Sequence, residues 1–115
     1  MTIKESNITI MVSNMEKSIS FYQSIGLIVK NRWNDHYAQL TAPGIVIGLH
    51  PTNDINLKGG SCNVSIGFTI DRFEEAESEL KKLSVIATSR EEEGGQFLHF
   101  NDPDGTALYF IKPKW

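Results

Sequence analysis

The 115-residue sequence lacks most of the features that mark exported, membrane-spanning or nucleic-acid-binding proteins. It has one cysteine, Cys62, which excludes an intrachain disulfide or a zinc site built on paired cysteines and favours a reducing cytoplasm. No apolar run approaches the ~20 residues that a membrane span needs, and the first seven residues hold no apolar leader, so neither membrane association nor export is expected. With 11 Lys and Arg against 14 Asp and Glu, a formal charge of −3 and no basic cluster, the chain is not expected to bind nucleic acid.

The composition that is present suits one packed domain. Hydrophobic residues make up 40% of the chain and charged residues 22%, enough for a core and too little charge for disorder. We predict a single domain over residues 1–115, with module one at about 7–50, a linker at 51–62 and module two at about 63–112.

The two modules share one apolar pattern. A shift of 58 residues, which places Ile8 on Ile66, aligns the halves through a strand, a helix and a second strand. Identity is low, so both an internal duplication and a chance match between α/β segments stay open. The matched pairs are Ile8/Ile66, Ile10/Phe68, Val12/Ile70, Met15/Phe73, Tyr22/Leu80, Leu27/Val85, Ile28/Ile86 and Arg32/Arg90.

Each module is predicted to run strand, helix and three strands, an α+β arrangement with the helix on one face of its sheet. We expect the two βαβββ modules to curl around a shared cleft, a common place for ligands. The expected helices lie near 15–25 and 72–83, and the expected strands at 8–12, 27–33, 36–41 and 45–50, then 64–70, 85–90, 96–101 and 106–112.

The helix ends carry recognisable signals. Ser13 with Glu16, and Asp71 with Glu74, have the spacing of a capping box, in which a side-chain oxygen accepts from a helix N–H and the Glu reaches back. Gly26 suits the C-terminal cap of the first helix.

Two segments resemble a known family. Residues 12–22, VSNMEKSISFY, followed by Ile25-Gly26-Leu27, resemble the opening of the vicinal oxygen chelate superfamily, which includes glyoxalase I, extradiol dioxygenases, and the fosfomycin and bleomycin resistance proteins. Residues 100–110, FNDPDGTALYF, resemble its last hairpin and strand. The resemblance covers nearly the whole chain and implies the paired βαβββ fold.

The same resemblance implies where a divalent ion would be held. The metal enzymes of the superfamily use His, Gln or Glu on the first and last strands of each module, and the matching positions here are Asn7, Gly48, Ser65 and Tyr109. None of these is a usual ligand, because Ser and Gly offer no strong donor and Asn and neutral Tyr are weak ones. We therefore predict no metal and no other cofactor.

The three histidines do not restore a metal site. His36 belongs to a polar turn, His99 to the strand before the Asp102–Gly105 turn, and His50 shares strand parity with Gly48. No pair has the i, i+4 spacing of a helical zinc site. His50 is the candidate acid/base or ligand-contacting group.

The remaining candidates line the sheet surfaces away from the helices. For Trp33 and Tyr37, filling the core between the sheets and contacting a ligand are both open interpretations. An aromatic surface with a few hydrogen-bonding groups suits a flat or cationic organic ligand. The predicted ligand-binding residues are Asn7, Thr9, Met11, Trp33, Tyr37, His50, Ser65 and Tyr109.

Three functions follow from these features. The leading hypothesis is a metal-free protein that binds a small organic molecule, similar in kind to bleomycin resistance proteins, which sequester a ligand without chemistry; catalysis is not expected. The alternatives are a metal-dependent lyase or dioxygenase with an atypical site, and a degenerate dimerisation or regulatory module. We also expect a homodimer, because family members often complete their clefts with a partner chain; Ile111, Pro113 and Trp115 are candidate contacts.

Overall fold

The computed structural model describes residues 1–54 and 64–114 and divides the chain into two compact units, residues 1–59 and 60–115. The division falls inside the predicted linker, most of which lies outside the described residues, as do Cys62 and Trp115. No helix of the described chain is long and apolar enough to cross a membrane.

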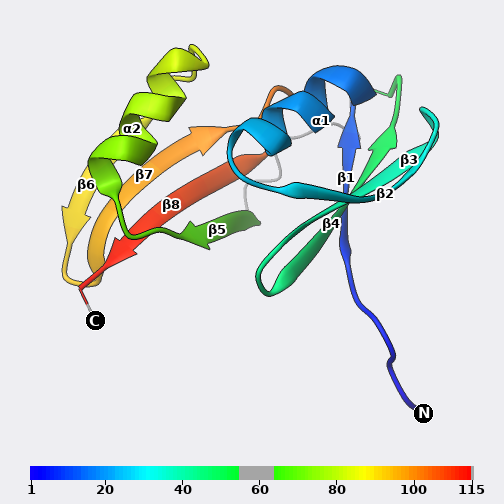
Figure 1. Ribbon diagram of the computed structural model, residues 1–115, viewed down its shortest axis with the longest axis horizontal. Coiled ribbons are helices and arrows are strands. Elements are labelled where there is room, and N and C mark those ends of the chain that lie inside the picture. Colours follow the sequence, from blue (N-terminus) through cyan, green and yellow to red (C-terminus); the bar gives the residue numbers. More distant parts are fainter. Residues whose placement is uncertain (55–63, 115) are drawn as a thin grey trace. The chain divides into compact units, whose positions relative to one another are not determined.

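The first unit is a four-stranded sheet with one helix. Its elements are β1 (Ile8–Val12), α1 (Met15–Ser24), β2 (Ile28–Trp33), β3 (Tyr37–Ala42) and β4 (Ile45–Pro51) (Figure 1). The strand order is β1-β4-β3-β2, with β1 parallel to β4 and the other neighbours antiparallel.

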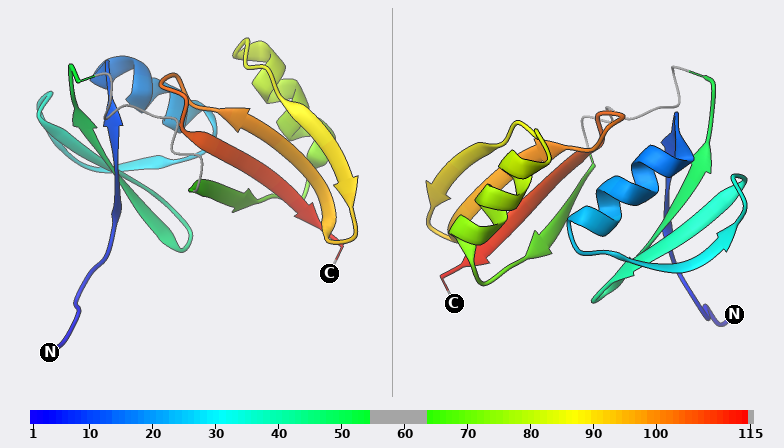
Figure 2. Two further views of the ribbon diagram at one scale, coloured as in Figure 1. Left: turned by 180° about the vertical axis from the view of Figure 1, so that it is seen from behind. Right: turned by 45° about the horizontal axis from the view of Figure 1, so that its top comes forward.

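The second unit repeats this plan. Its elements are β5 (Ser65–Thr69), α2 (Phe73–Lys82), β6 (Thr88–Glu92), β7 (Gly95–Asn101) and β8 (Ala107–Pro113). The strand order is β5-β8-β7-β6, with β5 parallel to β8 (Figure 2). The predicted α+β class and the order of two βαβββ modules are confirmed.

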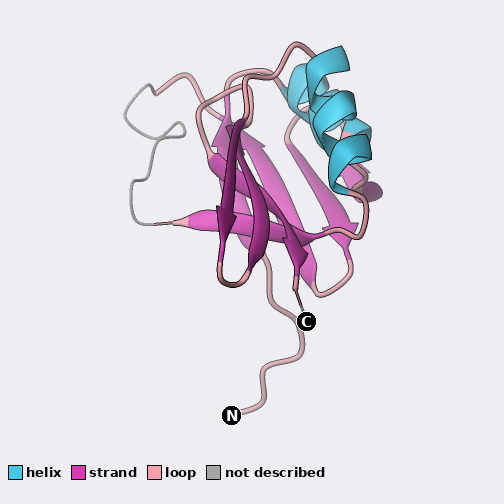
Figure 3. Ribbon diagram, turned by 90° about the vertical axis from the view of Figure 1, so that its left-hand side faces the viewer, coloured by secondary structure: helices cyan, strands magenta, loops and turns pink. Residues whose placement is uncertain are grey.

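In each unit the helix lies along one side of the strands (Figure 3), and the core forms between them. Strand alternation determines which side chains enter the core: Ile10 and Val12 on β1 are buried, whereas Thr9, which lies between Ile8 and Ile10, is exposed. The buried apolar residues of the first unit include Ile10, Val12, Ile19, Tyr22, Leu40, Ile47 and Leu49, and those of the second include Ile66, Phe73, Leu80, Leu98, Phe100, Leu108 and Phe110.

Both helices end in the same C-terminal motif. After α1, Gly26 has φ +111° and donates to the Gln23 carbonyl, and Leu27 donates to the Tyr22 carbonyl at 2.9 Å. This pair of bonds is a Schellman motif and confirms the predicted role of Gly26. After α2 the same bonds form around Ser84, a non-glycine residue at φ +59°.

The predicted capping boxes are wrong in their positions. The N-cap of α1 is Asn14, whose side chain accepts from the Lys17 N–H at 3.0 Å, one residue after the predicted Ser13. The N-cap of α2 is Arg72, also one residue later than predicted, and it forms no side-chain capping bond. Asn is as good an N-cap as Ser, so Asn14 can cap the helix one residue later than predicted.

The strand prediction after α2 starts three residues too early. The apolar pair Val85 and Ile86 led to a strand from residue 85, whereas β6 begins at Thr88 and Ile86 is 92% exposed. In β2 the register shifts between Val29 and Asn31, which marks a β-bulge at Lys30.

The bulge also overturns one predicted pair of the repeat. Arg32 pairs with buried Ala38 across β2 and β3. Its guanidinium forms one ion pair with Glu16 on α1 and another with Asp35 in the turn after β2. The hydrogen bond to Glu16, and then that to Asp35, raise the pKa of the Arg32 guanidinium. Arg90 instead pairs with Phe97, on the face of the second sheet away from α2, so the two arginines are not equivalent.

Candidate functional site

The face of the first sheet opposite α1 brings together most of the predicted site residues; we call it the first open face. Strand pairing builds one transverse row across it. Thr9 on β1 faces Gly48 on β4, and Gly48 faces Gln39 on β3. Gln39 in turn faces Asn31 on β2. The first open face consists of Asn7, Thr9, Met11, Ile28, Asn31, Trp33, Tyr37, Gln39, Thr41, Val46, Gly48 and His50.

The Tyr37 hydroxyl is the centre of a hydrogen-bond network on this face. Its oxygen accepts from Asn7 Nδ2 at 3.2 Å and from Gln39 Nε2 at 3.4 Å. Asn7 Nδ2 also donates to Thr9 Oγ1 at 3.1 Å, and Asn31 Nδ2 donates to Gln39 Oε1 at 3.4 Å. Since the Tyr37 oxygen already accepts two bonds, its own hydrogen is directed away from these partners and is available as a donor.

The Tyr37 ring fills the space where a side chain at position 48 would stand. A Cβ built on Gly48 would lie 2.8 Å from Tyr37 Cζ, and still closer to the hydroxyl oxygen, and 2.9 Å from Thr9 Oγ1. The ring is also stacked on Trp33, with centroids 5.5 Å apart and planes inclined by 27°. Glycine at 48 is therefore what lets Tyr37 reach Asn7.

The face of the second sheet opposite α2, the second open face, carries an aromatic cluster. His99 pairs with Tyr109 across β7 and β8, and their ring centroids are 5.8 Å apart. Phe97 lies 5.9 Å from His99 with nearly parallel rings and 6.1 Å from Tyr109. The Tyr109 ring lies across Gly67 of β5, where a Cβ would be 2.5 Å from Tyr109 Cε2. Ser65 is on this face and exposed.

His50 and Met11 lie side by side at the end of the first open face. They are partners across β1 and β4, and His50 is exposed. His50 Nδ1 lies 2.9 Å from the Pro51 carbonyl oxygen. A carbonyl oxygen only accepts, so Nδ1 is the donor in this contact.

A surface hollow of about 510 Å³ adjoins the first open face at Asn7. It is formed by the start of β1 and the β3–β4 hairpin, and of the predicted site residues it includes Asn7 alone. Its lining is Ser6, Asn7, Ile8, Thr41, Ala42, Gly44, Ile45 and Val46.

Several side chains on these faces lie outside the set of predicted ligand-binding residues. Asn31 and Gln39 take part in the Tyr37 network, and Phe97 and His99 stack beside Tyr109, yet none was among the predicted ligand-binding residues. Asn31 shares strand parity with Trp33, which is the signal that could have found it. The link between Gln39 and Tyr37 depends on ring orientation, which spacing does not reveal.

Comparison of the chain with known protein families identifies its superfamily. The family model of the Glyoxalase/Bleomycin resistance protein/Dioxygenase superfamily matches residues 6–110. The chain belongs to this superfamily. A curated relative, the metallothiol transferase FosB of Lysinibacillus sphaericus, is 31% identical, over 96% of this chain and 83% of its own length.

Solved structures of the superfamily share its fold. The fosfomycin resistance protein FosX from Listeria monocytogenes has a TM-score of 0.81 at 21% identity, over 99% of this chain and 96% of its own. The glyoxylase/bleomycin resistance protein/dioxygenase domain from Frankia has a TM-score of 0.73 at 20% identity, over 99% and 100% of the two chains. At these identities the likeness establishes the fold.

The four positions that the family assigns to a divalent ion do not fit one. Gly48 has no donor, and the space beside it is taken by Tyr37. Asn7 is neutral, and its amide oxygen is the one atom of its side chain that could bind a metal ion, as a weak ligand. Ser65 and Tyr109 add one aliphatic and one phenolic hydroxyl, both weak neutral ligands. Within residues 1–54 and 64–114, no three His, Cys, Asp or Glu side chains form a group that could hold a metal ion.

Proposed function

We propose that this chain binds a small organic molecule on its open sheet faces, without a metal ion and without catalysing a reaction. One observation carries the proposal: at a family metal position, Gly48, the side-chain space holds the Tyr37 ring, and the Tyr37 hydroxyl belongs to an amide network rather than a set of metal donors. The shared cleft between the two modules stays a prediction.

The chemistry of the faces supports binding. The first open face offers an outward hydroxyl donor, amide groups and the exposed Trp33 ring, and the second offers three clustered rings. Aromatic surface with a few placed polar groups is the usual composition of an organic-ligand site.

The test combines metal analysis with a stability screen. Protein purified without chelator should contain no tightly held ion, and Zn²⁺, Ni²⁺ or Mn²⁺ should not raise the melting temperature. Among thiol conjugates, fosfomycin and cationic antibiotics, at least one compound should raise it, and Tyr37→Phe or Tyr109→Phe should reduce that shift. One ion per chain that is lost on replacing Asn7 or Tyr109 would refute the proposal.

A second candidate is a metal-dependent transferase, and the 31% identity to the metallothiol transferase FosB favours it. It requires a donor set other than the four family positions. The assay is direct: fosfomycin is incubated with a thiol and Mn²⁺, and product is followed by mass spectrometry. Product formation that the chelator EDTA abolishes would establish this candidate in place of metal-free binding.

We also propose that the protein forms a homodimer. Ile28 and Ile86 follow their helices at matching positions and are 68% and 92% exposed. Burying such side chains would contribute about 25 cal/mol per Å² of apolar surface. Light scattering should give twice the 12.9 kDa mass of one chain; a monomer at working concentration would refute the proposal.

A further inference from the structure

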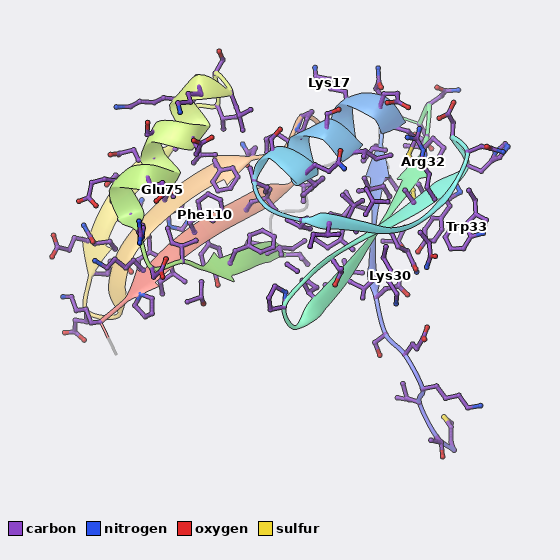
Figure 4. All side chains as sticks on the ribbon, in the orientation of Figure 1. Lys17, Lys30, Arg32, Trp33, Glu75 and Phe110 are labelled. Atoms are coloured by element: carbon purple, nitrogen blue, oxygen red, sulfur yellow. The ribbon has the colours of Figure 1, made fainter. Side chains whose placement is uncertain are left out.

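A positive charge that no described carboxylate neutralises lies beside the β2–β3 half of the first open face. β2 has two basic residues, Lys30 and Arg32. Arg32 points to the α1 side and is paired with Glu16 and Asp35. Lys30, at the bulge, extends away from α1 (Figure 4) and forms no ion pair within the described residues.

The neighbours of Lys30 on this face are donors and an aromatic ring. Asn31, the next residue on β2, pairs with Gln39 on β3. The side-chain amide nitrogen of each can donate two hydrogen bonds and donates one to a neighbouring side chain. The Tyr37 hydroxyl hydrogen is available, because its oxygen accepts from Asn7 and Gln39. The first open face itself contains no Asp or Glu, in a chain with 14 of them.

Trp33 supplies a flat apolar platform beside these donors. One side of its ring is stacked on Tyr37, yet the residue remains 51% exposed. Figure 4 shows it projecting from the hairpin that joins β2 and β3. A planar ring can therefore stack on the exposed side of Trp33, on the same strand that carries Lys30.

We propose that the β2–β3 half of the first open face binds a planar organic anion, an aromatic carboxylate in its simplest form, with Lys30 and the Tyr37 hydroxyl on the carboxylate and Trp33 beneath the ring. The inference rests on the proposed function, which it makes specific. Charge complementarity favours an anionic ligand. A cation would face the charge of Lys30 with no carboxylate nearby to bind it, and a neutral ring would form no ion pair with Lys30.

Three planar compounds of one shape test the charge: benzoate, benzamide and benzamidine. Binding is followed by NMR at the Trp33 indole N–H, which is assigned by its loss in Trp33→Phe. At low salt, benzoate should bind with a dissociation constant near the millimolar range, about threefold to fivefold tighter than benzamide, as expected for one exposed ion pair. Raised salt should remove that difference.

Variants separate the two groups on the carboxylate. Lys30→Gln should weaken benzoate about threefold to fivefold and leave benzamide unchanged, whereas Tyr37→Phe should weaken both, because a carboxamide oxygen also accepts from the hydroxyl. Lys17→Gln on the exposed side of α1 is the matched control and should change neither.

The inference is overturned if benzamidine binds as tightly as benzoate, if Lys30→Gln behaves like Lys17→Gln, or if benzoate leaves the Trp33 signal unmoved. None of these results would by itself refute the proposed function, which would still be supported if a different organic compound raised the melting temperature of the metal-free protein. A tightly held metal ion would instead refute the proposed function, whatever benzoate does.

Discussion

Replacing Gly48 with alanine should destabilise the protein, and the sign of that effect should reverse when Tyr37 is removed. The new methyl group would meet the Tyr37 ring at 2.8 Å or less, closer than real Cβ contacts allow. Gly48 does not have a positive φ, and the other close atom, Thr9 Oγ1 at 2.9 Å, is the end of a side chain that can rotate away. The ring must move, and it loses its bonds to Asn7 and Gln39 and part of its stacking on Trp33.

The magnitude follows from these losses. Two long hydrogen bonds on a partly exposed face contribute together about 1 kcal/mol, at the low end of the usual range, and the stacking about 0.5 kcal/mol more. Replacing glycine with alanine also stabilises the folded state by about 0.5 kcal/mol, because alanine restricts the unfolded chain more than glycine does. Gly48→Ala should therefore cost about 1 kcal/mol in the wild-type chain and stabilise by about 0.5 kcal/mol in a Tyr37→Ala chain.

The assay is a double-mutant cycle by urea unfolding, followed by circular dichroism. The coupling between the two substitutions should be about 1.5 kcal/mol. A cost for Gly48→Ala that is the same with and without Tyr37 would refute the reasoning, since the ring would then not fill the space. Gly67→Ala with and without Tyr109→Ala provides a parallel cycle in the second unit, where the Tyr109 ring lies over Gly67.

Four further substitutions test the packing by the same unfolding assay. Ser84→Gly should stabilise the protein by about 0.5 kcal/mol, because Ser84 holds φ +59° in a motif that favours glycine, whereas Gly26→Ala at φ +111° should cost about 1 kcal/mol. Asp102→Ala should cost about 1–3 kcal/mol, since the buried carboxylate accepts from the backbone N–H groups of Asp104 and Thr106 at 2.9 and 2.8 Å. Ser18→Ala should stabilise by about 1 kcal/mol, because the buried Ser18 hydroxyl has no hydrogen-bond partner in the described chain and alanine favours the helix; unchanged unfolding midpoints would count against each.

The order of elements could be predicted because local patterns determine it. Alternating apolar residues predicted β1 at 8–12, and the apolar face of Met15, Ile19 and Tyr22 predicted α1 to within one residue of its end. Gly26 marked the end of α1 because its left-handed conformation disfavours other residues. These signals lie within one element and do not depend on tertiary contacts.

The errors arose where the pattern had two interpretations. Val85 and Ile86 are apolar and β-branched, but the chain there completes the motif after α2 before it enters a strand. The bulge at Lys30 changes which face the later residues of β2 occupy, so Arg32 and Arg90 match in sequence and lie on opposite faces of their sheets. A bulge has no clear signal in this sequence.

The candidate site was predictable only in part. Strand parity identified the residues of the two open faces on β1, β4, β5 and β8, because the first and last strands of each module alternate regularly. The Tyr37 ring on β3 lies over Gly48, which is diagonally opposite on β4. Its position depends on the stack with Trp33. Such an arrangement becomes visible only when ring positions are known.

The two units fill their family metal positions by different means. In the first, the position itself is glycine, and the bulk comes from Tyr37 on the neighbouring strand β3. In the second, the position is Tyr109, and the neighbouring β5 provides Gly67 as the space for its ring. Each tyrosine ring is therefore matched to a glycine: a carboxylate at 48 would collide with Tyr37, and a carboxylate at 109 would leave the space over Gly67 empty. Packing that is matched in pairs in both units supports the proposed metal-free binding of an organic molecule.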